Sequence, residues 1–381
     1  MTATEAPPIT VRSCADLIAS VPYLLGFHPT ESIVVIAIVG DRVRFVARGD
    51  LPAAVPPSQI ARRLASLLFR DPVDAIAIIG YGPSTAVTPI AEAVCDALRP
   101  TDVTVVDVLR VDEGRYWSYV CANPSCCPPE GKLFDLTTTC VGAAAVYAGR
   151  VALPDRESVA TSIAPVAGAA RAAMTEATAR ADTRLTALVD AARAAGEIGS
   201  TRLRSMAPRM VAAAVHANTR VAKALRAAGD EAVDEAVARY RVGRTLSDDE
   251  VAWLSVLLVH LPARDHAWEH TTDDEWHVDL WSDVVRRVDP PLAAAPASLL
   301  AFAAWRAGYG ALATIAVERA LAVDPDYALA RMIDEILEQC LPPSIMVDAA
   351  EQPHLAPPRR DQRRRRRWIG PHVGPGHDQA S

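Results

Sequence analysis

Three runs of apolar, mostly β-branched residues constrain the fold more than any other feature of the sequence. They are SIVVIAIVG (residues 32–40), DAIAIIGYG (74–82) and DVTVVDVLRV (102–111). Continuous apolar runs of this length are typical of strands that are buried on both faces of a sheet. Two segments with apolar residues at helical spacing, 56–69 and 84–98, separate the runs. A helix between two strands favours a parallel strand pair.

The first run is followed by a tight turn and a second strand pattern. RVRFVARGDL (42–51) alternates apolar and charged residues after Gly40 and Asp41, which predicts an antiparallel hairpin. A further hairpin is predicted around residues 115–135. The order β-β-α-β-α-β followed by a hairpin predicts an N-terminal α/β sandwich with a mixed sheet over residues 9–155.

From residue 157 the sequence becomes rich in alanine and loses its strand patterns. Residues 157–340 are predicted to form an all-α C-terminal domain. Within it, 162–196 predicts one or two helices that end at Gly196, and the next helical segment is predicted to end at Gly229.

Two local patterns refine the predicted helical domain. Ser247, followed three residues later by Glu250, has the spacing of a capping box at a helix start. Residues 294–330 read as helix, Gly-Tyr-Gly turn and helix, which resembles a single tetratricopeptide unit and predicts a tetratricopeptide-like hairpin. Residues 341–381 are rich in Pro and Arg and are predicted to form a disordered tail.

The predicted location is cytoplasmic, without a membrane segment. MTATEAPPIT at the N-terminus lacks the basic and apolar parts of a secretory signal. The most apolar windows, such as VAWLSVLLVHLPA, are shorter than the roughly 20 residues that span a bilayer. Because the cytoplasm keeps thiols reduced, the seven cysteines are not expected to form a disulfide framework.

Charge is distributed unevenly along the chain. The net charge is −7, yet residues 359–381 carry seven arginines against two aspartates. An acidic body does not suggest a nucleic-acid-binding surface. The run Arg363–Arg367 predicts weak, sequence-independent binding of a polyanion, and the alternative is a solvated tail with no dedicated partner.

The stretch GRYWSYVCANPSCCPPEG (114–131) contains three of the cysteines, Cys121, Cys126 and Cys127. A hairpin with packed thiols is favoured over a metal site, because the sequence has only one knuckle-like element and adjacent cysteines are expected to point in different directions. The alternative metal site consists of Cys121, Cys126, Cys127 and Cys140, with His28 as another source of a fourth ligand. A reactive thiol is a third interpretation.

A ligand pocket is predicted where the strands end. The glycines of GYGPST (80–85) would let backbone N–H groups approach an anion at a helix start, although turn chemistry alone also explains them. His28 precedes the first strand, and Arg48 and Asp50 share one side of the second strand, where they could bind a ligand or pair with each other. The predicted pocket residues are His28, Arg48, Asp50, Gly80, Tyr81, Gly82, Arg115, Trp117, Cys126 and Cys127.

Four segments carry a family resemblance. VPYLLGFHPTESIVVIAI (21–38), IIGYG (78–82), RYWSYVCANPSCCPPEG (115–131) and the helical segment 294–330 together resemble the actinobacterial family called domain of unknown function 4192. The resemblance covers most of residues 9–340. It implies an actinobacterial cytoplasmic protein, and it implies no activity.

The favoured function is that of a ligand-binding or protein-interaction scaffold, in which the helical domain docks a protein partner. The alternative is an enzyme that acts on a phosphorylated or otherwise anionic small molecule through the α/β domain. The familiar hydrolase signatures are missing from the sequence, so whether the protein is an enzyme is left open, as is the identity of any cofactor.

Overall fold

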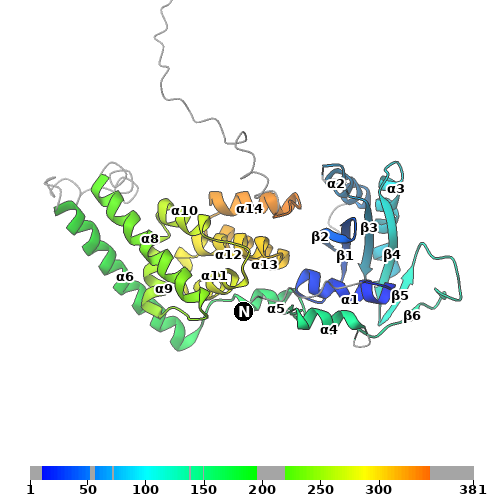
Figure 1. Cartoon of the computed structure of the whole chain (residues 1–381), viewed down its shortest axis with the longest axis horizontal. Coiled ribbons are helices and arrows are strands. Elements are labelled where there is room, and N and C mark those ends of the chain that lie inside the picture. The colour runs from blue at the N-terminus through cyan, green and yellow to red at the C-terminus, as the bar shows by residue number, and fades with distance from the viewer. Residues whose placement is uncertain are drawn as a thin grey trace, which may run out of the picture. The chain divides into compact units, whose positions relative to one another are not determined.

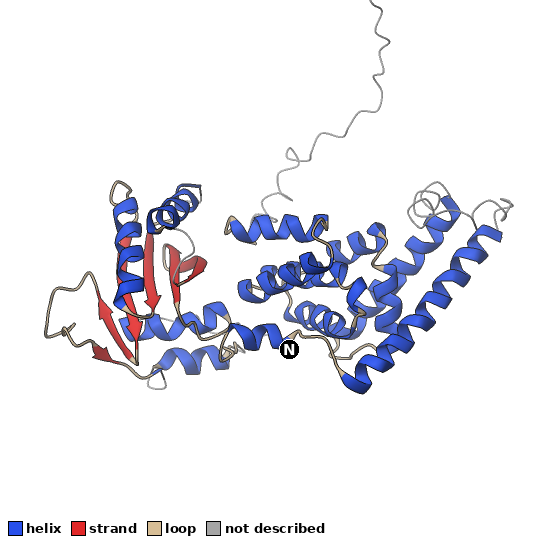
Figure 2. Ribbon diagram, turned by 180° about the vertical axis from the view of Figure 1, so that it is seen from behind, coloured by secondary structure: helices blue, strands red, loops and turns tan. Residues whose placement is uncertain are grey.

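A computed structural model describes residues 11–51, 56–70, 73–136, 139–148, 150–194 and 219–343 (Figure 1). Within these ranges the strands, drawn in red in Figure 2, all belong to the N-terminal part of the chain. The prediction of an α/β region followed by helices is confirmed. The described residues up to Pro342 form one unit by their contacts, and the domain boundary near residue 155 stays a prediction.

The N-terminal region is a six-stranded sheet in the order β2-β1-β3-β4-β5-β6. Only β3 and β4 pair in parallel, so the predicted mixed sheet is confirmed. Helices α1 and α4 were not predicted from the sequence. The elements are α1 (Cys14–Leu25), β1 (Ser32–Val39), β2 (Arg42–Asp50), α2 (Pro57–Arg70), β3 (Ala75–Tyr81), α3 (Ser84–Leu98), β4 (Thr104–Asp112), β5 (Arg115–Ser118), β6 (Lys132–Leu133) and α4 (Cys140–Tyr147).

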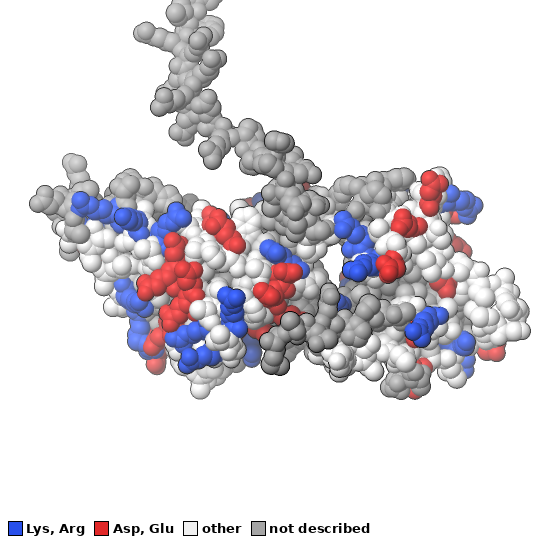
Figure 3. Space-filling model, in the orientation of Figure 1, with Lys and Arg blue, Asp and Glu red and all other residues white. Residues whose placement is uncertain are grey.

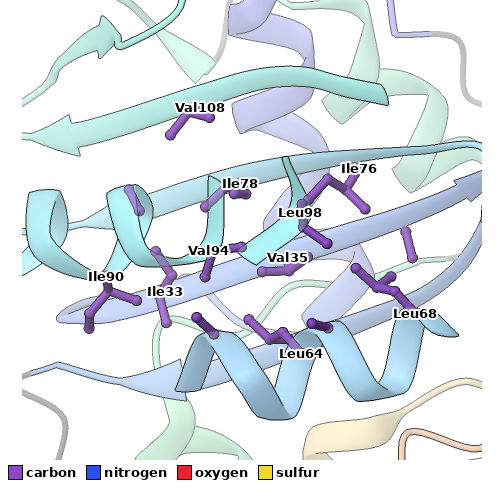
Figure 4. Packing of buried hydrophobic residues seen from close by; sticks show 14 of the residues in the cluster. Ile33, Val35, Leu64, Leu68, Ile76, Ile78, Ile90, Val94, Leu98 and Val108 are labelled. Atoms are coloured by element: carbon purple, nitrogen blue, oxygen red, sulfur yellow. The ribbon is translucent and has the colours of Figure 1, made fainter. Parts of the chain in front are cut away.

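One face of the sheet is covered by α2 and α3 (Figure 4). Ile33 and Val35 of β1 and Ile76 and Ile78 of β3 point towards Leu64, Leu68, Ile90, Val94 and Leu98 of these helices. Because successive side chains of a strand point to opposite faces, these residues alternate along β1 and β3. Removing such fully buried side chains from water is the main stabilising contribution to this region.

The opposite face of the sheet is also buried and carries the residues between those in the first core. Val34, Ile36 and Ile79 are each at most 1% exposed. Helix α1 contacts this face where the thiol of Cys14 donates a hydrogen bond to Asp107 of β4. Asp107 lies on this face because it pairs with Ala77, which alternates with the first-core residues of β3. The second face therefore holds this polar contact, and it also carries Ser32 and Arg48, beside its apolar residues.

The rest of the described chain is helical. Helix α12 is buried at every position from Ala294 to Trp305, as expected for a helix that is apolar all round and central in its region. The elements are α5 (Arg156–Ser162), α6 (Gly168–Ala194), α8 (Thr219–Arg241), α9 (Asp248–Leu257), α10 (Leu261–Glu269), α11 (Glu275–Arg287), η2 (Pro290–Leu292), α12 (Ala294–Arg306), α13 (Gly310–Val323) and α14 (Ala328–Glu338).

The prediction that a helix ends at Gly229 is wrong, because α8 runs through this residue to Arg241. A Cβ added at Gly229 would lie 2.5 Å from the Cβ of Ala263 in α10. The glycine therefore allows α10 to approach α8 closely, and it does not act as a helix stop. Gly196, the other predicted helix end, lies outside the described residues.

The capping box is confirmed at the start of α9, where the Ser247 hydroxyl accepts from the Glu250 N–H and the Glu250 carboxylate accepts from the Ser247 N–H. Helices α12 and α13 pack against each other as a hairpin. The likeness of this hairpin to a tetratricopeptide unit stays a prediction.

Candidate functional site

Several predicted pocket residues lie at one edge of the sheet, where β2, β3 and β4 end and β1 begins. Ser32 pairs with both Asp50 and Tyr81, and Tyr81 pairs with Val111. Arg115 begins β5 at the same edge. However, β2 and β5 are four strand spacings apart, a separation of about 19 Å. The sheet order thus separates the predicted set into a group near β1 and β2 and a group near β5.

In the first group, Arg48 already has three partners. Its Nε donates to the Ser32 hydroxyl at 3.1 Å, its guanidinium pairs with Asp50 at 2.6 Å, and it lies over the Phe27 ring. His28 is exposed, and its backbone N–H donates to the carbonyl of Leu153. The pairing of Arg48 with Asp50, one of the two alternatives predicted for these residues, is the arrangement observed.

The GYG segment is occupied by packing and backbone contacts. Gly80 lies against Val87 of α3, where any side chain on residue 80 would overlap the valine. Gly82 has a φ of +140° and donates its N–H to the carbonyl of Val111 at 2.9 Å. Because Pro83, which has no N–H, occupies the N-cap of α3, this turn offers an anion fewer donors than its glycines suggest.

Tyr81 differs from its neighbours, since its buried hydroxyl has no hydrogen-bond partner among the described residues. Burial raises the pKa of this phenol. The aromatic ring of Tyr81 therefore packs in the core, while its hydroxyl oxygen has no hydrogen-bond partner among the described residues.

In the second group, Arg115 and Trp117 hold the ends of the β5–β6 loop, residues 119–131. Arg115 donates to the carbonyl of Gly131 at 2.9 Å, and the Trp117 indole N–H donates to the carbonyl of Pro129 at 3.0 Å. The Arg110 guanidinium, paired with Asp112, covers the Trp117 ring at 3.5 Å. These contacts fix the loop, and they leave the indole face occupied.

The β5–β6 loop brings three thiols together. The sulfur atoms of Cys121, Cys126 and Cys127 all lie within 4.8 Å of one another. The backbone N–H groups of Cys126 and Cys127 both donate to the carbonyl of Asn123, and the Asn123 side chain accepts from Ser125. We define these three cysteines as the thiol cluster. Cys140, the fourth residue of the alternative metal set, is exposed at the start of α4 and is not part of it.

The expectation that adjacent cysteines point in different directions fails here for a local reason. Side chains alternate strictly only in an extended strand. Cys126 and Cys127 lie in a turn that is closed on the Asn123 carbonyl, so both thiols reach the same point. The adjacency of Cys126 and Cys127 is therefore no argument against a metal site.

Hydrogen bonds join the thiol cluster to β4 and α1. The N–H of Cys121 donates to the Ser118 hydroxyl at 3.1 Å, and this hydroxyl donates to Asp107 Oδ1 at 2.8 Å. Asp107 Oδ2 accepts from the thiol of Cys14 at 3.2 Å. Asp107 and Cys14 were not among the predicted site residues. The available signal was an acidic residue in the middle of the apolar run VTVVDVLRV (103–111).

The thiols of this network differ in acidity. Hydrogen bonds from the Asn123 backbone and from the Cys127 and Cys126 side chains lower the pKa of Cys121. Burial and contacts with the other two thiols raise the pKa of Cys127 to about 12. Burial and the bond to Asp107 raise the pKa of Cys14 to about 11. Without a cation, one thiolate therefore opposes the ionisation of its neighbours.

A second group with metal-ligating side chains, Asp234, His266 and His270, lies between α8 and α10. His266 pairs with Asp234 at 2.8 Å and also approaches Asp230, while His270 Nδ1 is bonded to the carbonyl of His266. These groups already form hydrogen bonds with one another. In the same region, a hollow lined by Trp253 and its neighbours has a volume of about 80 Å³, below the roughly 300 Å³ at which small-molecule sites begin.

Comparison with known protein families gives one result. The family described as Domain of unknown function (DUF4192) matches residues 15–344, which is most of the chain. The chain belongs to this family. The match includes α1 except its first residue, Cys14, and it includes the sheet, the β5–β6 loop and the helices through α14, so the segments that carried the resemblance are parts of one family unit.

Two further comparisons, with curated proteins and with solved structures, each gave no match. Among the described residues of this DUF4192 member, no helix combines the length and apolar character that crossing a bilayer requires. The family's description names no activity, so function has to be argued from the site.

Proposed function

We propose that this DUF4192 protein is a binding scaffold whose ligand is a thiophilic divalent metal ion held by Cys121, Cys126 and Cys127. Zn²⁺ is the ion that we favour. The observation that carries the proposal is the mutual approach of the three sulfur atoms to within 4.8 Å. Tetrahedral zinc at about 2.3 Å from each sulfur implies sulfur–sulfur separations of about 3.8 Å. A contraction of at most about 1 Å would therefore complete the ligand geometry.

The loop supports this proposal because hydrogen bonds within the chain hold its shape. Arg115 and Trp117 anchor its second half, and the turn at Asn123 sets the two adjacent thiols. The Asn123 N–H also donates to the Cys121 sulfur, a bond that stabilises a thiolate. Preorganisation of this kind lowers the entropy that binding must overcome.

Charge in the loop also favours a cation held by thiolates. Glu130 is the only charged residue from Tyr119 to Gly131. Figure 3 shows this end of the α/β region largely without acidic or basic side chains. Thiolates are therefore the main negative charge that the loop can present, and soft thiolate ligands select ions such as Zn²⁺.

The alternative, an enzyme for an anionic small molecule, has less support. Its proposed arginines are engaged, since Arg48 pairs with Asp50 and Arg115 donates to the carbonyl of Gly131. An anion would have to displace these partners. Docking of a protein on the helical region stays a prediction, as does polyanion binding by Arg363–Arg367, which lies outside the described residues.

The experiment is a metal analysis of protein purified without added metal, repeated after loading with zinc and dialysis. We expect about one equivalent of zinc, as a single thiolate site holds one ion, and its loss in Cys121→Ser and Cys126→Ser. Cys140→Ser is the matched control and keeps the ion. A protein that retains no zinc after loading, or that loses none on Cys121→Ser, contradicts the proposal.

A further inference from the structure

The thiol cluster supplies three ligands, whereas tetrahedral zinc takes four. This inference rests on the proposed metal site and concerns its remaining ligand. Two candidates border the cluster through described contacts, the thiol of Cys14 and the carboxylate of Asp107, and they are hydrogen-bonded to each other at 3.2 Å. The fourth ligand therefore depends on which member of this pair faces the ion.

The position of Asp107 has the marks of a constrained polar group. It lies on the sheet face that also holds the buried residues Val34, Ile36 and Ile79, and it is bound by three donors. The Ser118 hydroxyl and the Val108 N–H donate to Oδ1, and the Cys14 thiol donates to Oδ2. A carboxylate has about four acceptor sites, so one site on Oδ2 remains for a cation.

The carboxylate is linked to the thiol cluster by a short path. Ser118 accepts from the N–H of Cys121 and donates to Asp107. Asp107 is not among the groups within 4.8 Å of the three sulfurs, so binding has to draw the loop towards β4. Ser118 lies where β5 ends and the loop begins, so this is the position at which the loop would have to turn towards β4.

The hydrogen bond between them decides between the two candidates. If Cys14 were the ligand, the bond that it donates to Asp107 Oδ2 at 3.2 Å would be lost. If Asp107 is the ligand, Cys14 keeps its proton and its hydrogen bond. Carboxylates that bind metals are commonly held by such outer hydrogen bonds.

We propose that Asp107 is the fourth ligand of the ion, which gives a site of three thiolates and one carboxylate oxygen. The ion then joins β4 to the β5–β6 loop. Cys14 and Ser118 are positioning residues that orient the carboxylate from α1 and β5. The thiols of the cluster release their protons to solvent as the ion binds.

Cobalt substitution tests this, because thiolate–Co²⁺ charge-transfer bands report the number of sulfur ligands. The full-length protein is compared with Asp107→Ala, Cys14→Ser and Ser118→Ala, with folding checked by circular dichroism. We expect unchanged charge-transfer intensity per bound ion in all three variants. Affinity should fall by on the order of 100-fold or more in Asp107→Ala, and by roughly 10-fold in Ser118→Ala, the range for outer partners.

A second readout separates a ligand from a merely structural residue. In the protein with Asp107 the cobalt site is closed, so added azide should leave its spectrum unchanged. In Asp107→Ala the fourth position holds exchangeable water, and azide should shift the d–d bands. X-ray absorption of the zinc form, expected to show three sulfur ligands and one oxygen, needs no variant and covers the case in which Asp107→Ala does not fold.

The outcomes distinguish this inference from the proposed function. No charge-transfer band in the unaltered protein overturns both. Bands that lose about a quarter of their intensity in Cys14→Ser, one thiolate of four, show that Cys14 is the ligand and overturn the assignment of Asp107 alone. Unchanged affinity and an unchanged azide response in Asp107→Ala would also overturn the assignment of Asp107 alone. His270→Ala, in the group formed by Asp234, His266 and His270, is the matched control and should leave every band unchanged.

Discussion

The β1–β2 end of the sheet and the β5–β6 loop both collect chemically active side chains, but they differ in how those side chains are satisfied. Arg48 has a carboxylate, a hydroxyl and an aromatic ring as partners. The three thiols of the loop have mainly one another. Opposite charges neutralise each other, whereas several thiols cannot all ionise without a cation. The comparison indicates that a site is better recognised by groups that lack a complementary partner than by reactive residue types.

The largest expected effect is that of removing the metal. If zinc binds only the folded protein, free zinc at 1,000 times its dissociation constant stabilises that state by about 4 kcal/mol. Chelation should therefore lower the unfolding free energy of the α/β region by about this amount. Denaturant titration with and without a chelator measures it, and Cys126→Ser is the control that should not respond. An equal response in Cys126→Ser would place the stabilising ion elsewhere.

The next prediction extends the comparison to a buried group of the helical region. His277 is 1% exposed, and neither ring nitrogen has a hydrogen-bond partner among the described residues. Burial lowers its pKa to about 4, from an ordinary value of 6.5. The unfolded chain therefore takes up a proton below pH 6.5 while the folded protein does not, and stability falls as the pH drops from 6.5 towards 4.

This loss should reach roughly 3 kcal/mol at pH 4. The measurement is the unfolding free energy at pH 7, 5.5 and 4, compared with that of His277→Leu, which has nothing to protonate and should lose correspondingly less. A variant with the same pH dependence as the unaltered protein would mean that other groups cause the acid sensitivity.

A third prediction tests whether the loop fold itself is required. Gly131 has a φ of +79°, and a side chain on it would overlap the Trp117 ring. Gly114, in the turn between β4 and β5, has a φ of +73° and nothing within 4 Å of an added Cβ. Gly131→Ala should therefore cost about 2 kcal/mol more than Gly114→Ala, since overpacking is added to backbone strain. Thermal unfolding compares them, and equal costs would show that Trp117 simply moves aside.

Much of the fold follows from the sequence, because its signals are local. β-Branched runs and helical periodicity predicted the strands and crossover helices, and α3 begins and ends where its pattern does, at 84 and 98. The end predicted at Gly229 failed because glycine was used there for close packing against Ala263. That reason belongs to a contact between two helices, and it is invisible along a single segment.

The candidate site was predictable only in part. Cys126 and Cys127 were identified from the sequence, but their convergence depends on a turn around Asn123. Asp107 and Cys14 are 93 residues apart and meet only through the packing of α1 on the sheet. Local patterns cannot supply such a pair, although an acidic residue inside an apolar strand is a signal that can be sought.

A fourth prediction concerns Tyr81, the unsatisfied group within the otherwise satisfied sheet edge. Its buried hydroxyl lacks a partner among the described residues, and an unpaired buried polar group costs about 1–3 kcal/mol. Tyr81→Phe should therefore leave stability unchanged or raise it by about 1 kcal/mol. Chemical denaturation measures the change. A loss above about 1 kcal/mol would mean that the hydroxyl has a partner, and that this edge is fully satisfied after all.

The smallest effect is expected at the ion pair of the β1–β2 end. Asp50 is 78% exposed while Arg48 is 19% exposed, so water screens the pair from one side. Exposed pairs contribute about 0–1 kcal/mol, and Asp50→Asn should cost less than about 0.5 kcal/mol. Arg48→Ala should cost more, because it also removes contacts with Ser32 and the Phe27 ring. The two are compared by denaturation at low and high salt, where the Asp50 effect should shrink by the larger fraction. If Asp50→Asn instead creates measurable affinity for inorganic phosphate, Arg48 is an anion site that Asp50 occupies. Both this end of the sheet and the thiol cluster would then be able to bind a ligand, and they would differ only in whether the site is already occupied.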